Sequence, residues 1–512
     1  MKRKSAFSGV IILTLALIAV KVLSAIYRVP YQNVLGDAGL YAYQQVYPFL
    51  SLATILSMNA IPSAVTQNFG AHATAKRMSH AMIWIQGTCF VLFVLICLGA
   101  PVIAHIMGDQ HLTPMIRMAS CSFLVVGCLG VLRGSFQARQ QMEYPAYSQV
   151  IEQIVRVGII LVMIAVFALY DWSIYQVGKW SILASGLGFL AATVFLSWKR
   201  PFGFQWTWRE ATMPKAVWSR LAAAIIIFSV SHLIVTTWQL MDSFSVIRTL
   251  QHYGLSFHEA IVQKGIYDRG ASFIQIGLIV TTTFCFVLIP LLTNAFSEQR
   301  FERMNRYADA TLKITVTISV AAGVGLMNLL PIMNRVFFKN DVLTVTLVIY
   351  MITVICVSLI MVNIALLEVR EQSRLILFAF AIGAVIKLGL NILLIPKIGI
   401  VGASISTVSS LCLFACVLQY RTLKFYRLRN MSYFVWKLAA AMLAMTVAVQ
   451  TVMYLWPAGG RLIGMAELLS AAAAGVIVVI AAIVYLNLLT YRELQHMPFG
   501  HKLYRIKKGR KS

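Results

Sequence analysis

The sequence contains few acidic residues and few charged residues of any kind. There are 17 Asp and Glu residues against 43 Lys and Arg residues, and charged residues make up only 12% of the 512 residues. Soluble globular domains carry about a quarter charged residues, so this composition excludes an ordinary soluble protein. Hydrophobic residues make up 60% of the chain, and its mean hydropathy is +0.80. We therefore expect an integral membrane protein.

The sequence also lacks the motifs that mark catalysis and metal binding. It contains no Walker loop, dinucleotide fingerprint, nucleophile elbow or zinc-protease helix. All eight cysteines lie in apolar stretches, and Cys412 and Cys416 have no histidine or carboxylate beside them in a ligand pattern. The connections between apolar stretches are short, with the longest around 199–220 and 242–269. There is no room for a soluble catalytic domain, so we expect a transporter without cofactor or metal.

Long apolar runs dominate the rest of the chain. A helix crosses a bilayer in about 20 residues, and a backbone in lipid must satisfy its hydrogen bonds internally. No strand-like alternation appears, so we predict an all-α integral membrane protein with about fourteen transmembrane helices. The N-terminal run has the basic start of a signal peptide, but no small-residue cleavage site follows it, so we assign it as the first span. The predicted spans are 8–27, 41–67, 81–106, 118–132, 148–170, 180–198, 221–241, 270–292, 311–336, 342–367, 375–396, 399–420, 433–455 and 463–489.

The basic residues are distributed unevenly between the two sides of the membrane. If the N-terminus is cytoplasmic, the inner segments hold 30 of the 43 Lys and Arg residues, the outer connections hold 10, and three lie inside spans. This is the positive-inside pattern, and an even number of spans puts both termini in the cytoplasm. The basic inner clusters are expected to contact anionic lipid headgroups. The net charge of +26 therefore requires no nucleic-acid partner.

A weak internal repeat suggests two lobes. The segment "IVRVGIIL" at 154–161 resembles "VIKLGLNIL" at 385–393, which pairs Arg156 with Lys387, although a chance alignment of apolar segments is the alternative. Six helices return the chain to its starting side, so the halves would share one orientation. The predicted parts are an N-lobe of spans 1–6, a C-lobe of spans 7–12, spans 13 and 14, and a basic cytoplasmic tail, at 1–200, 201–430, 431–490 and 491–512.

Polar side chains inside the spans are the candidate functional residues. A charge near the bilayer centre costs about 2.5–3.5 kcal/mol, so such side chains should face a wet cavity or a partner. Glu152 and Arg156 share one helix face with two amides, and they could simply pair with each other. Asp242 could pair with Arg248 or Arg269 at the outer surface. The candidates for the cavity and its gate are Gln149, Glu152, Gln153, Arg156, Asp242, Gln275, Lys387 and Asn391.

The basic residues suggest an anionic substrate. Lys21 lies in the first span and Arg28 at its outer end, and neither has an acid nearby within its helix. Inside the spans there are three bases against one acid, Glu152. Arginine suits phosphate in particular.

Several segments resemble a known family. "LRGSFQARQQMEYPAYSQVIEQIVRV", "KVLSAIYRVP", "MDSFSV" with "GIYDRGASFIQ", and "KLGLNILLIPKIGIVGASIST" are similar to motifs of polysaccharide-biosynthesis membrane proteins. These belong to the multidrug/oligosaccharidyl-lipid/polysaccharide exporter superfamily, and the chain most resembles its branch of stage V sporulation protein B and MurJ-type lipid II flippases. The resemblance covers most of residues 8–420.

The resemblance implies a fold and an activity. It implies fourteen helices in two lobes around a central cavity, with the last two helices forming a groove for a lipid tail. It implies alternating-access flipping of a polyprenyl-diphosphate-linked sugar, with Lys21, Arg28 and Arg269 at the positions expected to hold the diphosphate. Lys21 departs from the family, which usually has arginine there, and lysine lacks the bidentate fork.

Alternatives remain open at this stage. They are a cation-coupled multidrug exporter of the same superfamily and a non-transporting scaffold for wall synthesis. A coupling ion is possible, and a monomer of this size would suffice.

Overall fold

The computed structural model describes residues 27–70, 74–199, 215–428, 430–456 and 459–489, together with Leu23. Within these ranges every regular element is a helix, which confirms the all-α fold class. The elements are α2 (Arg28–Ile55), η1 (Leu56–Ala60), α3 (Ile61–Phe69), α4 (Ala75–Met107), η2 (Gln110–Leu112), α5 (Thr113–Ser120), α6 (Phe123–Ala138), α7 (Glu143–Leu169), α8 (Ile174–Trp198), α9 (Lys215–His252), α10 (Phe257–Ser297), α11 (Phe301–Phe338), α12 (Thr344–Glu368), α13 (Ser373–Ile398), α14 (Val401–Phe425), α15 (Met431–Leu455) and α16 (Arg461–Tyr485).

The helices match the predicted spans closely. Each predicted span from the second to the fourteenth overlaps a described helix or a broken helix, whereas the first span lies almost entirely outside the described residues. Among the described residues, 11 helices are long and apolar enough to cross a membrane. The bent pair Ala216–Ser229 and His232–His252 makes up to 12. The chain is a multi-pass membrane protein.

The chain forms two compact units. Unit 1 is Met1–Arg269 with Asn391–Gly399, and unit 2 is Gly270–Leu390 with Ile400–Ser512. Helices α10 and α13 each contribute residues to both units. The lobe boundaries predicted at residues 200 and 430 stay predictions.

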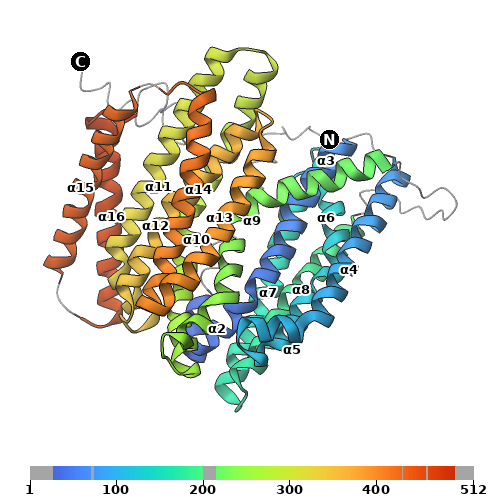
Figure 1. Ribbon diagram of the computed structural model, residues 1–512, viewed down its shortest axis with the longest axis horizontal. Helices are drawn as coiled ribbons and strands as arrows, with labels where there is room; N and C mark the ends of the chain where they lie inside the picture. The colour runs from blue at the N-terminus through green and yellow to red at the C-terminus, as the bar shows by residue number, and fades with distance from the viewer. Residues whose placement is uncertain are drawn as a thin grey trace. The chain divides into compact units, whose positions relative to one another are not determined.

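Unit 1 is a helix bundle whose core is tightened by glycine. Helix α6 packs between α4, α3 and α8, and α7 packs along α8 (Figure 1). Gly130 and Gly134 of α6 face Ile61 and Val65 of α3, and a Cβ at either glycine would lie within 3.0 Å of those side chains. Small residues permit this close backbone approach between membrane helices. A face of α6 therefore lies directly against α3.

The side chain of a glutamine replaces backbone hydrogen bonds at the break between α5 and α6. Cys121 and Ser122 keep right-handed helical backbone angles, but N–H groups here bond to carbonyls three residues back. The α-helical hydrogen-bond pattern is therefore interrupted inside a membrane-spanning segment. Gln86 of α4 donates to the carbonyl oxygens of Phe123 and Leu124 at 3.0 and 2.8 Å, and its Oε1 accepts from the N–H of Cys128 at 3.0 Å. Unsatisfied backbone groups in lipid cost several kcal/mol, so this side chain stabilises the break.

A π-helix precedes Pro62. In η1, the N–H of Ile61 bonds to the carbonyl of Leu56, five residues earlier. A proline has no N–H, so Pro62 cannot donate to the carbonyl of Ser57. That carbonyl lies 3.5 Å from Nη1 of Arg133, which supplies a donor from α6.

Unit 2 is built around α11, α12 and α14. Helices α11 and α12 pack along each other, α14 packs on α12, and α15 and α16 pack together against α11 (Figure 1). Arg370, in the connection after α12, lies among four aromatic rings, with its guanidinium carbon 5.4–5.8 Å from their centroids. The rings are those of Phe296, Phe301, Phe425 and Tyr426. This cation–π cluster stabilises one end of the α11–α12–α14 group.

Candidate functional site

The polar stripe of α7 faces the inside of unit 1. Gln149, Glu152, Gln153 and Arg156 are 3%, 2%, 0% and 8% exposed, whereas Ile154 on the other face is 59% exposed. Their spacing of three and four residues places them on one helix face. The predicted amphipathic character of this helix is confirmed, and its polar face packs inside unit 1.

Glu152 binds two arginines at the same time. Its Oε1 accepts from Nη2 of Arg156 at 2.8 Å, and its Oε2 accepts from Nη2 of Arg133 at 2.8 Å. All three side chains are buried. Two guanidinium groups and one carboxylate give the three residues a net charge of +1. The Glu152–Arg156 pair was one of the alternatives that the sequence left open, and the structure contains it.

Arg133 links three segments of the chain. Its Nε donates to Oγ of Ser148 on α7 at 3.0 Å, and its Nη1 lies 3.4 Å from Oγ of Ser57 in η1. Together with its bond to Glu152, the guanidinium ties α6, α7 and the π-helix at one point. A buried charge needs such a full set of partners.

Arg28 lies beside a group of tyrosines, which we call the tyrosine cluster. Its guanidinium carbon is 5.0 Å from the ring centroid of Tyr47, and the residue is 1% exposed. Tyr27 and Tyr43 share a hydrogen bond at 3.0 Å between their hydroxyl groups. The electrostatic neighbours of Arg28 and of Arg156 both include these three tyrosines. Two arginines, from α2 and α7, therefore border the same cluster of Tyr27, Tyr43 and Tyr47.

Arg269 is held by a carboxylate that the sequence analysis had placed in a connection. Its Nη2 lies 2.5 and 2.6 Å from the two oxygens of Asp37, and its Nε donates to Asp37 at 3.0 Å. Gln32 donates to the same carboxylate at 2.9 Å. Gly36, with φ of 74°, breaks α2 just before Asp37 and allows the chain to turn there. A substrate anion would have to compete with Asp37 for Arg269.

Lys264, Asp268 and Asp242 form a second group of buried charged residues in unit 1. Lys264 lies 2.5 Å from Oδ1 of Asp268. Asp242 accepts from the hydroxyl of Tyr267 at 3.1 Å and from Nδ2 of Asn391 at 2.8 Å. Asp242 and Asn391, predicted separately, therefore lie together, although 149 residues separate them in the chain. Arg248, one candidate partner of Asp242, donates to the carbonyl of His105.

The other predicted residues lie elsewhere. Lys387 is fully buried in unit 2, where its ammonium donates to Oγ1 of Thr407 at 2.7 Å and to the carbonyl of Ala403 at 3.2 Å. Gln275 is half-buried in the part of α10 that belongs to unit 2. Lys21 lies outside the described residues.

Several buried or half-buried charged residues were not indicated by the sequence, among them Arg133, Asp37 and Asp109. Arg133 stands one residue after a predicted span and was counted with a connection, yet α6 continues to Ala138. The three glycines spaced before and after it, at 127, 130 and 134, were a signal of close packing. Asp37 and Asp109 lie in predicted connections. Asp109 is buried, and its Oδ2 accepts from the hydroxyls of Tyr41 and Tyr175 at 3.3 and 2.8 Å. Polar residues near span ends gave no signal of this burial.

Comparison with known proteins gives the family. The sequence profile described as polysaccharide biosynthesis protein matches residues 6–296, more than half of the chain. The chain belongs to this family. An uncharacterized membrane protein of Bacillus subtilis (strain 168), YabM, is 31% identical over 99% of this chain and 98% of its own length. The lipid II flippase MurJ of the same organism is 26% identical over 78% of this chain and 79% of its own length.

Solved structures share the fold of this polysaccharide biosynthesis family member. The lipid II flippase MurJ in its inward closed conformation matches 94% of this chain and 100% of its own, with a TM-score of 0.70 and 14% identity. An inward-facing multidrug resistance MATE family transporter of the MOP superfamily matches 80% and 98%, with a TM-score of 0.61 and 14% identity. At these identities the matches establish the fold alone.

Proposed function

We propose that this protein is a flippase that moves a polyprenyl-diphosphate-linked sugar, a cell-wall precursor or a polysaccharide repeat unit, across the membrane by alternating access. Its relatives include a protein named lipid II flippase. No covalent bond forms or breaks in such a step, so the proposal needs no catalytic residue and no cofactor. A coupling ion or the membrane potential would supply the energy.

One observation carries the proposal: buried positive charge outweighs buried negative charge around the tyrosine cluster. Arg28 and Arg156 border the cluster, and Arg133 joins them through Glu152. Arg133 and Arg156 share the Glu152 carboxylate, and Arg28 is an electrostatic neighbour of Asp268, which also binds Lys264. These four buried basic side chains thus face two buried carboxylates. Guanidinium groups bind phosphate oxygens through paired hydrogen bonds, and a low-dielectric site strengthens that attraction. The excess charge suits the diphosphate of the substrate.

The multidrug exporter of the same superfamily is the second candidate, because such a transporter shares the fold. A site for cationic drugs requires available carboxylates. The carboxylates of unit 1 described above each accept from a basic or polar side chain; they are the buried Glu152, Asp268, Asp242 and Asp109 and the half-buried Asp37. This arrangement favours the flippase over the exporter.

A reconstitution assay tests the proposal. Purified protein in phosphatidylcholine vesicles should accelerate the transbilayer movement of a polyprenyl-diphosphate-linked sugar, measured by the access of an external enzyme to the sugar. Arg28→Gln should lower the rate at least about tenfold, because loss of a charged hydrogen-bond donor costs about 1.5–3 kcal/mol. Arg303→Gln, a change at an exposed arginine of α11, is the matched control.

Two results would contradict the flippase. One is a translocation rate equal to that of empty vesicles for every polyprenyl-diphosphate substrate tested. The other is accumulation of a cationic dye against its gradient, which would favour the exporter. Unchanged function of a correctly inserted Arg28→Gln protein in cells would favour the scaffold.

A further inference from the structure

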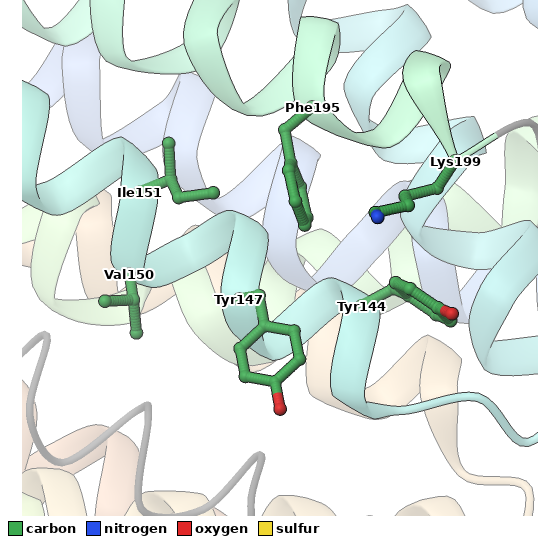
Figure 2. Close-up of a pocket in the computed structure, with 6 residues that line it drawn as sticks. All are labelled: Tyr144, Tyr147, Val150, Ile151, Phe195 and Lys199. Carbon is green, nitrogen blue, oxygen red and sulfur yellow. The ribbon is translucent and has the colours of Figure 1, made fainter.

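A pocket lies between the beginning of α7 and the end of α8, and none of the buried charged residues described above lines it. It has a volume of about 390 Å³ and is lined by Tyr144, Tyr147, Val150, Ile151, Phe195 and Lys199 (Figure 2). Five of these six described lining residues are apolar or aromatic. The sixth is a lysine at its edge. None of these residues belongs to the proposed transport site.

The inner wall of the pocket is fixed by the core of unit 1. The ring of Tyr144 lies 4.7 Å from that of Phe136, a buried core residue, and Phe195 packs against the same core cluster. Well-packed rings have few alternative rotamers, so the wall is formed before any ligand arrives. A preformed pocket costs little ordering when it binds.

Exposed aromatic rings lie at and beside the outer side of the pocket. Tyr147 and Trp198 are large exposed rings, and both lie near the ends of helices that are long and apolar enough to span a membrane. Aromatic rings at such positions mark the membrane–water interface. An apolar hollow at this depth borders lipid, so a lipid chain is the available ligand.

Lys199 provides charge at the polar edge of the hollow. It follows the last residue of α8, and its ammonium lies 5.9 Å from the ring centroid of Phe195 and 4.7 Å from that of Trp198. Figure 2 shows this ammonium pointing back toward Phe195, on the same side as the ring of Tyr144. The residue is exposed, so a ligand can reach it. Among the residues that the structure describes, none that lines the pocket is acidic.

We propose that this pocket binds an anionic phospholipid of the surrounding bilayer. The phosphate lies at the Lys199 ammonium, and one acyl chain lies along Val150, Ile151 and Phe195. The sequence predicts that this end of α7 and α8 is cytoplasmic, and the cytoplasmic leaflet carries the anionic lipids. The apolar wall fits any acyl chain, whereas the lysine selects a negatively charged headgroup. The inference does not depend on which substrate the protein transports.

Site-resolved photolabelling tests this inference. The full-length protein is placed in phosphatidylcholine vesicles that contain phosphatidylglycerol or phosphatidylcholine with a diazirine on one acyl chain, and labelled peptides are mapped by mass spectrometry. Peptides with residues 144–151 and 195–199 should be labelled about fivefold more by phosphatidylglycerol, as expected for one basic side chain near an anionic headgroup. Lys199→Gln should reduce that labelling to the phosphatidylcholine level.

A matched control lies on the same helix. Lys179 stands over the ring of Trp180 at 4.8 Å, near the other end of α8, and no residue there lines the pocket. Lys179→Gln should leave the phosphatidylglycerol labelling unchanged. Val150→Trp, which fills the hollow without changing charge, should abolish labelling of Ile151 and Phe195.

Three outcomes would overturn the inference. They are equal labelling of the unmodified protein by both lipids, phosphatidylglycerol labelling that survives Lys199→Gln, and displacement of the label by an added polyprenyl diphosphate. The last result would assign the pocket to the transported lipid. The comparison of the two lipids on the unmodified protein decides the question even if a variant fails to insert.

Discussion

Glu152 is the shared acceptor of Arg133 and Arg156, which bind its two carboxylate oxygens at 2.8 Å each. The two arginines come from different helices, α6 and α7, so the carboxylate joins these helices as well as the charges. Removing one member of such a buried group leaves the others uncompensated. The group is therefore a point where one substitution affects both packing and the charge beside the tyrosine cluster.

Replacing the shared carboxylate should destabilise the protein. Glu152→Gln leaves two buried guanidinium groups without their anion, a change that typically costs about 3–5 kcal/mol. We expect a lower melting temperature of the purified protein, measured by intrinsic fluorescence in detergent. Glu143→Gln, at the first turn of the same helix, is the control and should melt like the unmodified protein. Equal melting temperatures for Glu152→Gln and the control would show that the ion pairs add no net stability.

Asp37 should compete with the substrate for Arg269. Arg269→Gln is expected to slow translocation at least about tenfold, because it removes a charged donor worth about 1.5–3 kcal/mol. Asp37→Asn leaves the guanidinium in place without its bidentate partner, so the concentration of substrate for half-maximal rate should fall. The measurement is the initial rate of translocation against substrate concentration. If both variants lose activity and abundance to the same extent, the pair has a structural role only.

The glycine contact between α6 and α3 should not tolerate a side chain. A Cβ at Gly130 would lie 2.7 Å from Cβ of Ile61, so Gly130→Ala forces the two helices apart. Overpacking of this kind costs about 1–3 kcal/mol and should lower the melting temperature. Gly158→Ala on α7 meets open space and should be neutral or stabilising, since alanine favours helix more than glycine does. A stable Gly130→Ala protein would mean that α3 can shift away freely.

The predicted topology can be tested with single cysteines in a variant from which the native cysteines have been removed. Leu255→Cys, between α9 and α10, should react only with a membrane-impermeant thiol reagent added from outside. Gln299→Cys, an exposed position between α10 and α11, should react only after the membrane is opened. The reason is the concentration of basic residues on the side that contains residue 299. The reverse pattern would place both termini outside.

The spans and the polar stripe could be predicted because both are local properties of the sequence. Thirteen predicted spans match described helices, since a membrane span depends on some twenty consecutive apolar residues. The stripe from Gln149 to Arg156 follows from spacing on one helix, and its burial follows from the cost of charge in lipid. Neither prediction required knowledge of which helix packs on which.

The partners of the charged residues could not be predicted because they lie on other helices, far away in the sequence. Asp37 meets Arg269 across 232 residues, and Arg133 meets Glu152 across a break between two helices. Such contacts depend on helix packing, which in a membrane is set by small side chains and by shape rather than by hydrophobic pattern. The sequence indicated Glu152 and Arg156 as a pair because they are four residues apart, and it gave no comparable distance for Arg133.

The π-helix before Pro62 also determines the direction in which the side chains of α3 point relative to those of α2. One extra residue in a turn rotates everything that follows by about 100° relative to an uninterrupted α-helix. Before η1, α2 presents Tyr43 and Tyr47 to the tyrosine cluster, and after it, α3 presents Ile61 and Val65 to the glycines of α6. Deleting a single residue from η1 would return the span to one continuous phase and turn one of these two faces away from its partner.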